Sequence, residues 1–533
     1  MASSKRVGRL RTFAPLAVAA ATLALMVATG PRLALGFDEE ISLRRMERVR
    51  SWLAAMADPP GFARGWDPSR VRMLPDDSPP PGPADVSTRR SLLRPAVVRW
   101  FWPFARQEPH GHPPFYVLVG LAGDALAPGW AELPRARLGT MLAFGLAGGA
   151  PYAAAAARAG PWAGATASAA WVFHPDLFGL GHYATYDALL SSLWLGAILA
   201  FARAVQGPRA RWAWALLLGG LMGAAASTKF TGWLLPIPFF FYVALARDGR
   251  ALRALLVAGL VGIATVYALN PAWWADPVGG VEAFLRSNLG RARTAPMPVS
   301  FLGRIYVTPG ESLPWYNTLA WTLFATPVGF LSLALAGAWR SLRAGRGEVL
   351  GRLGVAHWAF LLILRALPHT PGHDGVRQFL PAFGCLALLA GLGAEGALRR
   401  LGRWARPALG LAIAEGAARV ALMMLVPLSY YSPLIGGPAG AARLGMEPTY
   451  YWDALGDDAI AWLRVNTPPG QTVMFSTNTE SWSYLVRTGK LEAVSPFAPG
   501  PRAWYVLQNR PGAFTRLDRA LVAGGRGRVL AST

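Results

Sequence analysis

The feature that most constrains the fold is a series of apolar runs, most of them close to the length of a membrane span. A helix needs about 20 predominantly apolar residues to cross a bilayer. Only 15% of the residues are charged, whereas soluble proteins carry about 25%. The sequence therefore predicts an all-α polytopic membrane protein with about 11 transmembrane helices. The runs lie at 13–35, 138–157, 161–178, 184–204, 211–228, 231–246, 251–270, 315–337, 354–368, 377–398 and 407–427.

The formal charge of +23 comes from arginines that gather in short loops between these runs. Such loops are typical of the cytoplasmic side of a membrane protein, so the charge does not indicate nucleic-acid binding. If these arginine-rich loops are cytoplasmic, the N-terminus lies inside and the C-terminus lies outside. A weaker run at 113–130 contains Asp124 and several glycines. It has no place as a single crossing in this topology, and we expect it to be partly inserted or re-entrant.

Three segments are predicted to lie outside the membrane: a first loop at 36–137, a long loop at 271–314 and the region 430–533. In the first loop, residues 41–57 have the apolar spacing of an amphipathic helix, and 58–95 resemble a loop. We expect that helix to lie in the membrane plane with its arginines near lipid phosphates. Residues 430–533 alternate short apolar stretches with helical patterns, which predicts a small α/β cap on a 1–429 catalytic domain.

Nearly every polar residue that looks out of place in an apolar chain maps to the outer side. Asp38 and Glu39 directly follow the first span, and Lys229 lies between two spans. Acids beside cations at this position suit a reaction with an anionic lipid headgroup. Two simpler readings stay open: a solvated helix end for the acids, and a lysine that extends to the interface. The other residues of this group are His110, His112, His174, Asp176, His182, Asp187, Arg291, Arg293, His369, His373, Asp374 and Arg377.

Several kinds of chemistry have no support in the sequence. Cys385 is the only cysteine, so no intrachain disulfide is possible. No HExxH spacing, Walker loop or GxGxxG turn occurs. We therefore expect neither a cofactor nor a metal ion.

From the first span to about residue 465, the chain resembles the bacterial glycosyltransferases of family 39. These are the protein O-mannosyltransferase-like enzymes with the GT-C membrane fold. The order of six short motifs carries the resemblance more than any single motif does. The motifs are Asp38-Glu39, His112-Pro-Pro-Phe-Tyr116, 182–187, 227–232, 270–277 and 374–381.

The resemblance implies a polyprenyl-phosphate-linked sugar, a hexose such as mannose, as the donor. It implies inverting transfer to an acceptor hydroxyl on the outer face of the bacterial inner membrane. Asp38 would then be the base, and Glu39 would orient it or the acceptor. We expect Lys229, His112, Arg291 and Arg293 to contact the donor phosphate, and His182, Asp187, Asp374 and Arg377 to bind substrate.

The sequence leaves the acceptor open among a protein, a lipid and a polysaccharide, with membrane lipids as further partners. One alternative is a transporter or flippase of lipid-linked glycans, although no internal repeat of the kind common in transporters was found. A second is a catalytically inactive relative that serves as a membrane-anchored binding module.

Overall fold

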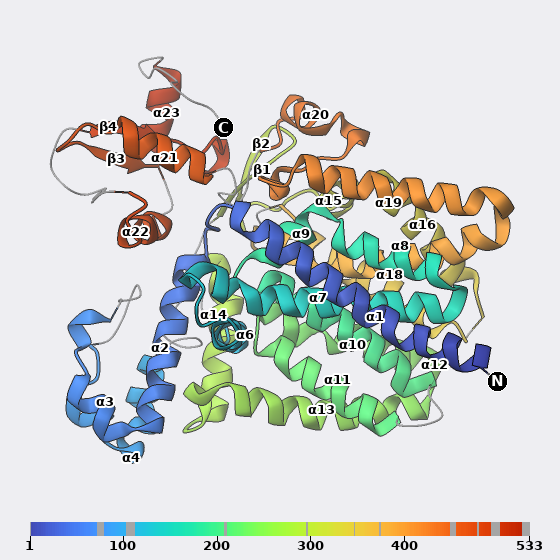
Figure 1. Ribbon diagram of the computed structural model, residues 1–533, viewed down its shortest axis with the longest axis horizontal. Coiled ribbons are helices and arrows are strands. Elements are labelled where there is room, and N and C mark those ends of the chain that lie inside the picture. Colours follow the sequence, from blue (N-terminus) through green and yellow to red (C-terminus); the bar gives the residue numbers. More distant parts are fainter. Residues whose placement is uncertain are drawn as a thin grey trace.

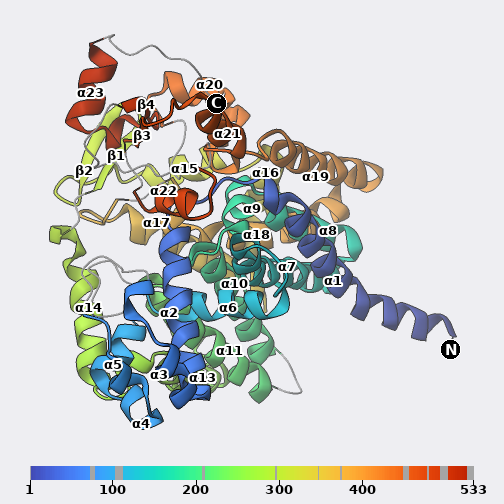
Figure 2. The same ribbon diagram turned by 60° about the vertical axis from the view of Figure 1, so that its left-hand side comes forward.

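The structure is a computed structural model of the 533-residue chain. Its long helices pack side by side, with the N-terminus at one end of the bundle and the outer loops and C-terminal region at the other (Figures 1 and 2). It describes residues 2–71, 79–102, 112–206, 211–294, 297–345, 347–372, 375–447, 455–476, 479–491 and 502–524.

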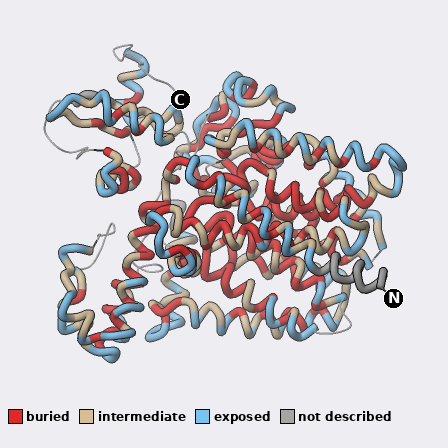
Figure 3. The backbone as a smooth tube through the Cα atoms, viewed as in Figure 1, coloured by how far each residue is buried: buried red, intermediate tan, exposed pale blue. Residues whose placement is uncertain are grey.

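Among these described residues, 6 helices are long and apolar enough to cross a membrane. Most of the buried residues in the view of Figure 3 lie in the helices at the centre of the bundle, whereas the helices around it alternate buried and exposed residues. The six are the Phe13–Arg32 part of α1 (Ala2–Thr29) and η1 (Gly30–Arg32), α7 (Glu132–Ala159), α10 (Asp187–Gln206), α13 (Gly249–Leu269), α17 (Val349–Ala366) and α18 (Pro381–Arg400).

Other predicted spans are interrupted or short, so the count of about 11 is not fully confirmed. The run 161–178 divides into α8 (Pro161–Val172) and α9 (Pro175–His182), and 315–337 divides into α15 (Asn317–Ala325) and α16 (Val328–Arg343). A proline lies at each break, and proline disfavours helical geometry in the residue before it. The remaining pieces are α6 (Phe115–Leu126), α11 (Arg211–Ala226), η4 (Phe230–Leu234), α12 (Pro236–Ala246) and α19 (Ala405–Leu422).

Glycines allow the central helices to approach closely. A Cβ on Gly393 of α18 would clash with the backbone carbonyl of Leu333 in α16, and one on Gly337 would clash with Leu389. In the same way, Gly223 of α11 lies against Gly262 and Thr265 of α13. Both pairs run parallel, so each pair begins at one end of the bundle and finishes at the other.

The arginine-rich loops gather at one end. Arg158, at the end of α7, pairs with Glu348 at 2.5 Å and with Glu395 of α18 at 3.3 Å. Arg340 of α16 joins the same Glu395 at 2.5 Å, and Gln206 of α10 donates to the carbonyl of Gly347 at 3.2 Å. Loops far apart in sequence therefore share one basic end, as the charge pattern predicts.

The helix α2 (Glu39–Ala57) packs against protein on more faces than expected. Arg45 and Arg48 are 5% and 0% exposed. Arg45 donates to the Tyr116 hydroxyl, while Arg48 donates to the carbonyl of Trp100 at 3.1 Å and lies 4.3 Å from its ring centroid. The expectation that these two arginines face lipid phosphates was wrong, because α5 (Pro95–Phe101) and α6 supply acceptors that helical periodicity does not reveal.

The predicted loop at 58–95 was also incorrect, since short helices fold back along α2. The side chains of Asp58, Asp67 and Thr88 cap three of these helices, and a proline lies in the first turn of each of the others, which explains where they begin. They are α3 (Pro59–Gly65), η2 (Pro68–Arg70), η3 (Pro83–Val86), α4 (Arg89–Leu92) and α5 (Pro95–Phe101).

The long loop after α13 contains the helix α14 (Pro277–Thr294) and an antiparallel hairpin of β1 (Met297–Phe301) and β2 (Arg304–Thr308). The C-terminal region has the expected small α/β character, with parallel strands β3 (Thr472–Phe475) and β4 (Arg502–Val506). Its helices are α20 (Gly437–Arg443), α21 (Asp457–Asn466), α22 (Thr479–Arg487) and α23 (Arg516–Ala523).

Contacts hold this region to the end of the bundle opposite the arginine loops. Arg487 of α22 pairs with Glu40 at 3.4 Å and with Glu132 at 2.7 Å. Arg44 of α2 donates to Ser483 at 2.7 Å. Burial raises the pKa of Tyr484 to about 12, and the carboxylates of Glu132 and Glu39 contribute. The predicted boundary at residue 430 stays a prediction.

Candidate functional site

Four charged side chains from four parts of the chain form a continuous network, which we call the charge cluster: Asp38, Asp187, Lys229 and Arg377. Arg377 donates from Nη2 to Asp38 Oδ2 at 2.6 Å and from Nε to Asp187 Oδ2 at 3.0 Å. Lys229 Nζ donates to the other oxygen of Asp187 at 2.7 Å. Two carboxylates and two cations therefore balance in charge, which a buried cluster requires.

Helix ends position these groups. Asp187 is the first residue of α10, where a carboxylate is favoured by the helix dipole. Lys229 follows the end of α11 in an extended conformation, with φ −155° and ψ 151°. The chain turns back so closely that a Cβ on Gly232 would clash with the carbonyl of Ala225. Arg377 begins the short turn η6 (Arg377–Phe379) that leads into α18.

Three of the sequence motifs meet at the turn that holds Ser227 and Lys229. Phe115, in the His112 motif, donates its backbone N–H to the carbonyl of Ser227 at 2.8 Å. Asn270, at the end of α13, donates from its side chain to the Ser227 hydroxyl at 3.0 Å. Three motifs that are far apart in the sequence are therefore joined by hydrogen bonds beside Lys229.

Tyr186 ties the cluster together, and sequence reasoning missed it. Its hydroxyl donates to Asp38 Oδ2 at 2.9 Å. The Lys229 ammonium lies 5.1 Å from its ring centroid, and the His112 ring packs against it at 3.8 Å between centroids. The available signal was its position in the motif at 182–187, directly before Asp187.

The four members of the charge cluster differ in accessibility. The Asp187 and Lys229 side chains are 0% and 4% exposed, whereas Arg377 is 11% and Asp38 is 19% exposed. Asp38 is thus the member of the charge cluster that an incoming molecule reaches most easily. The buried pair beneath it holds Arg377 in place.

Glu39 lies beside Asp38 in sequence but faces a different environment. Its oxygens accept from Nε and Nη2 of Arg137 at 2.8 and 2.6 Å, and from the backbone N–H groups of Gly36 and Ala184 at 2.7 and 2.9 Å. Arg137 also donates to the carbonyls of Gly30, Leu33 and Ala34, which follow α1. Glu39 is 0% exposed. This geometry suits an acid that fixes the Asp38 loop.

The structure does not bring His182 to the charge cluster. It is 0% exposed, and its ring nitrogens contact the Thr29 hydroxyl at 2.8 Å and the Phe178 carbonyl at 2.7 Å. Arg291 and Arg293 fall in the last turns of α14, and their side chains are outside the described part of the structure. Asp374, with His110 and His373, also lies outside the described residues.

An apolar cavity of about 410 Å³ opens beside this site, at the ends of α1 and α7. Arg137 forms one wall of it, so the cavity and the Glu39 pairing share a side chain. Across the described ranges, no group of three or more His, Cys, Asp or Glu residues could hold a metal ion. Chemistry without a metal remains a prediction. The cavity is lined by Val27, Gly30, Pro31, Trp130, Ala131, Pro134, Arg137 and Met141.

Known proteins provide independent evidence on the fold. The structure resembles the crystal structure of ArnT from Cupriavidus metallidurans bound to undecaprenyl phosphate, with a TM-score of 0.53 and 15% identity over 89% of this chain and 84% of that chain. The apo structure of the same protein has a TM-score of 0.52 and 16% identity, over 97% of this chain and 89% of that chain. The chain has the GT-C glycosyltransferase fold.

Residues 112–274 match the family of dolichyl-phosphate-mannose-protein mannosyltransferases. The resemblance to family 39 is therefore confirmed, and the apolar helices are those of a multi-pass membrane protein. The matched residues include His112, Tyr186, Asp187 and Lys229, but not Asp38 or Arg377. A comparison with curated protein sequences found no match.

Proposed function

We propose that this protein transfers a sugar, a hexose such as mannose, from a polyprenyl-phosphate donor to an acceptor hydroxyl, with inversion at the anomeric carbon. The observation that carries the proposal is the charge cluster, in which an accessible carboxylate and two cations meet at one end of a GT-C bundle. The family match and the fold likeness to a protein bound to undecaprenyl phosphate support a lipid-phosphate donor.

Asp38 is the proposed base. As the acceptor oxygen forms its bond to the anomeric carbon, its proton passes to the Asp38 carboxylate and the bond to the phosphate oxygen breaks. The lipid phosphate leaves with the electron pair. Tyr186 and Arg377 hold the Asp38 carboxylate in a fixed orientation. A positioned base contributes about 10²–10⁴-fold to such a reaction.

Lys229 and Arg377 are the proposed phosphate partners. Negative charge grows on the leaving phosphate, and cations already in place stabilise it without reorganisation. Asp187 bridges both cations and sets their spacing, which makes it a positioning residue. His112, packed on Tyr186, borders the same space. Arg291 and Arg293 remain proposed phosphate ligands, and Asp374 a proposed substrate contact.

We further propose that Glu39 orients Asp38 through the loop it fixes, and that His182 contributes by joining α9 to the end of α1. The clustering of arginine loops at the opposite end supports a cytoplasmic N-terminus and an extracytoplasmic site and C-terminus in a bacterial inner membrane. The acceptor is a protein, a lipid or a polysaccharide.

A test uses the purified protein in liposomes with a prenyl phosphoryl mannose, and membranes from a deletion strain as the source of acceptor. The measured quantities are lipid phosphate released and sugar attached to new product. We expect the wild type to release lipid phosphate and to attach sugar to a new product. In Asp38→Asn, both rates should fall by at least about 10²-fold. Asp67→Asn is the matched control, because Asp67 is an exposed carboxylate in the same outer loop.

Two outcomes would contradict the proposal. Wild-type turnover in a correctly folded Asp38→Asn protein would remove Asp38 as the base. Movement of the lipid-linked sugar across the bilayer, without release of lipid phosphate, would instead favour a flippase.

A further inference from the structure

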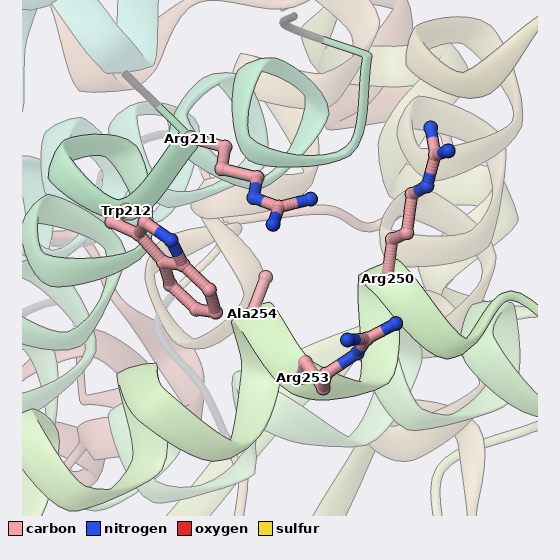
Figure 4. Close-up of a pocket in the computed structure, with 5 residues that line it drawn as sticks. All are labelled: Arg211, Trp212, Arg250, Arg253 and Ala254. Carbon is pink, nitrogen blue, oxygen red and sulfur yellow. The ribbon is translucent and has the colours of Figure 1, made fainter. Parts of the chain in front are cut away.

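A second group of cations lies at the basic end, where α11 and α13 begin side by side. Arg211 and Trp212 open α11, and Arg250 and Arg253 lie in the first turns of α13. These residues and Ala254 line a small pocket. Figure 4 shows the three guanidinium groups arranged around a common space, with the Trp212 indole at its side.

These arginines differ from the paired ones at the same end. In the described part of the chain, none of the three lies within ion-pair distance of a carboxylate. Arg253 Nε donates to the carbonyl of Gly249 at 3.2 Å, and the Arg211 guanidinium lies 5.0 Å from the centroid of the Trp212 ring. The nearest acid in sequence, Asp248, accepts from the backbone N–H groups of Arg250 and Ala251 as the cap of α13.

By contrast, Arg158, Arg340 and Arg399 at the same end all pair with Glu395, at 2.5–3.3 Å. Each of these three arginines therefore has a carboxylate partner within ion-pair distance. The pocket keeps an excess of positive charge from three arginines and one capping aspartate, so it favours an anion.

The surface next to the pocket identifies the kind of anion. Leu216 and Leu217 of α11 are 51% and 47% exposed, and Leu252 and Leu256 of α13 are 40% and 55% exposed. These leucines continue from the arginines along the same two helices. An anion with apolar chains would place its charged group in the pocket and its chains on the leucines, as basic pockets between membrane helices do with lipids.

The donor phosphate does not account for this pocket. The parallel helix α13 has 21 residues, so its ends are about 30 Å apart at 1.5 Å per residue. The far end, at Asn270, is the one bonded to Ser227 beside Lys229.

We infer that the pocket of Arg211, Arg250 and Arg253 binds the phosphate of an anionic phospholipid from the leaflet opposite the charge cluster. The lipid phosphate accepts from the guanidinium groups, the acyl chains lie on the exposed leucines, and Trp212 lies at the level of the headgroup, where tryptophans concentrate.

The test measures lipid binding by native mass spectrometry of the purified full-length protein, with dioctanoyl phosphatidylglycerol as the probe. Dioctanoyl phosphatidylcholine and inorganic phosphate serve as comparison ligands. The triple variant R211Q/R250Q/R253Q should bind phosphatidylglycerol at least about tenfold more weakly. The control R343Q/R400Q/R403Q removes equal charge from exposed arginines of the same end, two of which also lie over tryptophan rings, and should change binding less than twofold.

Equal loss in both triple variants would show a diffuse charge effect and overturn the site. Equal binding of phosphatidylcholine would remove the role of charge. Competition by inorganic phosphate at the same concentration as the lipid would show a site for soluble anions. If the triple variant does not fold, the single variants R211Q and R250Q are tested instead. Each should bind phosphatidylglycerol about threefold more weakly, or weaker still.

Discussion

The charge cluster and the Glu395 network are both made of carboxylates and cations at helix ends, yet only one has the features of a reactive site. Glu395 is 4% exposed and its oxygens accept from Arg158, Arg340 and Arg399. In the charge cluster, Asp38 is 19% exposed and an aromatic hydroxyl shares its oxygen with Arg377. Ion pairing alone therefore does not distinguish chemistry from structure. Access to one carboxylate, and the meeting of separate motifs around it, does.

Among the variants that would test this difference between the two networks, we expect the largest loss of activity at Lys229. We expect Lys229→Met to lower kcat by about 10²–10³-fold, because the growing charge on the leaving phosphate loses a fixed cation. The rate of lipid phosphate release from a prenyl phosphoryl sugar measures it. Lys490→Met is the matched control, since Lys490 pairs with Asp457 at 2.6 Å in the exposed C-terminal region. Equal activity in the two variants would leave Lys229 a structural partner of Asp187.

Tyr186→Phe should have a smaller effect on the same rate. The change removes the hydrogen bond to Asp38 and keeps the ring between His112 and Lys229. We expect kcat to fall about tenfold with little change in KM, because one bond to a charged group is worth about 1.5–3 kcal/mol. Tyr186→Ala should also raise KM, since the packing is lost. A Phe variant that changes only KM would show that Tyr186 contacts substrate and does not position the base.

On the structural side of the comparison, Glu395→Ala should lower stability and leave chemistry intact. Removing Glu395 takes the shared carboxylate from three arginines that are 27–71% exposed, so solvent screens the remaining charges and the cost is about 0.5–3 kcal/mol. A fall in the melting temperature, with unchanged kcat per folded molecule, is the expected result. Thermal unfolding followed alongside donor turnover checks it. A selective loss of turnover would mean that the two networks are coupled through α18.

The smallest effect is expected at an exposed pair. Glu282→Gln breaks the contact with Arg286 on α14, where the two side chains are 64% and 77% exposed. Surface pairs contribute about 0.2–1 kcal/mol at most. Neither the melting temperature nor the turnover should change measurably. A clear loss of turnover would indicate that α14 contacts a substrate, as proposed for Arg291 and Arg293.

The sequence predicted the features that follow from composition and local pattern. Apolar length predicted a multi-pass helical protein, although only 6 of the described helices are long and apolar enough to cross a membrane. The loop arginines predicted one basic end, and Asp38 and Lys229 were named from their positions at the ends of spans. The motif order predicted a resemblance to family 39, and the family match over 112–274 supports that resemblance.

What the sequence could not reveal depends on contacts between distant residues. Arg137 is 98 residues from Glu39, and no local pattern indicates that it saturates that carboxylate. Tyr186 lies in the motif at 182–187, but no local pattern indicates that its hydroxyl donates to Asp38. The arginines of α2 were predicted to lie near lipid phosphates, because helical periodicity does not show which carbonyls and rings of a later segment pack against them. Breaks at Pro175 and Pro327 were missed because hydropathy averages over single residues.

The most direct test of the central claim separates donor binding from chemistry at Asp38. The measurement compares the Kd for a prenyl phosphoryl mannose with the single-turnover rate, for wild type, Asp38→Asn and Lys229→Met. The account predicts that Asp38→Asn keeps the Kd within about threefold and loses at least about 10²-fold in rate, whereas Lys229→Met weakens binding as well. A full single-turnover rate in Asp38→Asn would contradict it.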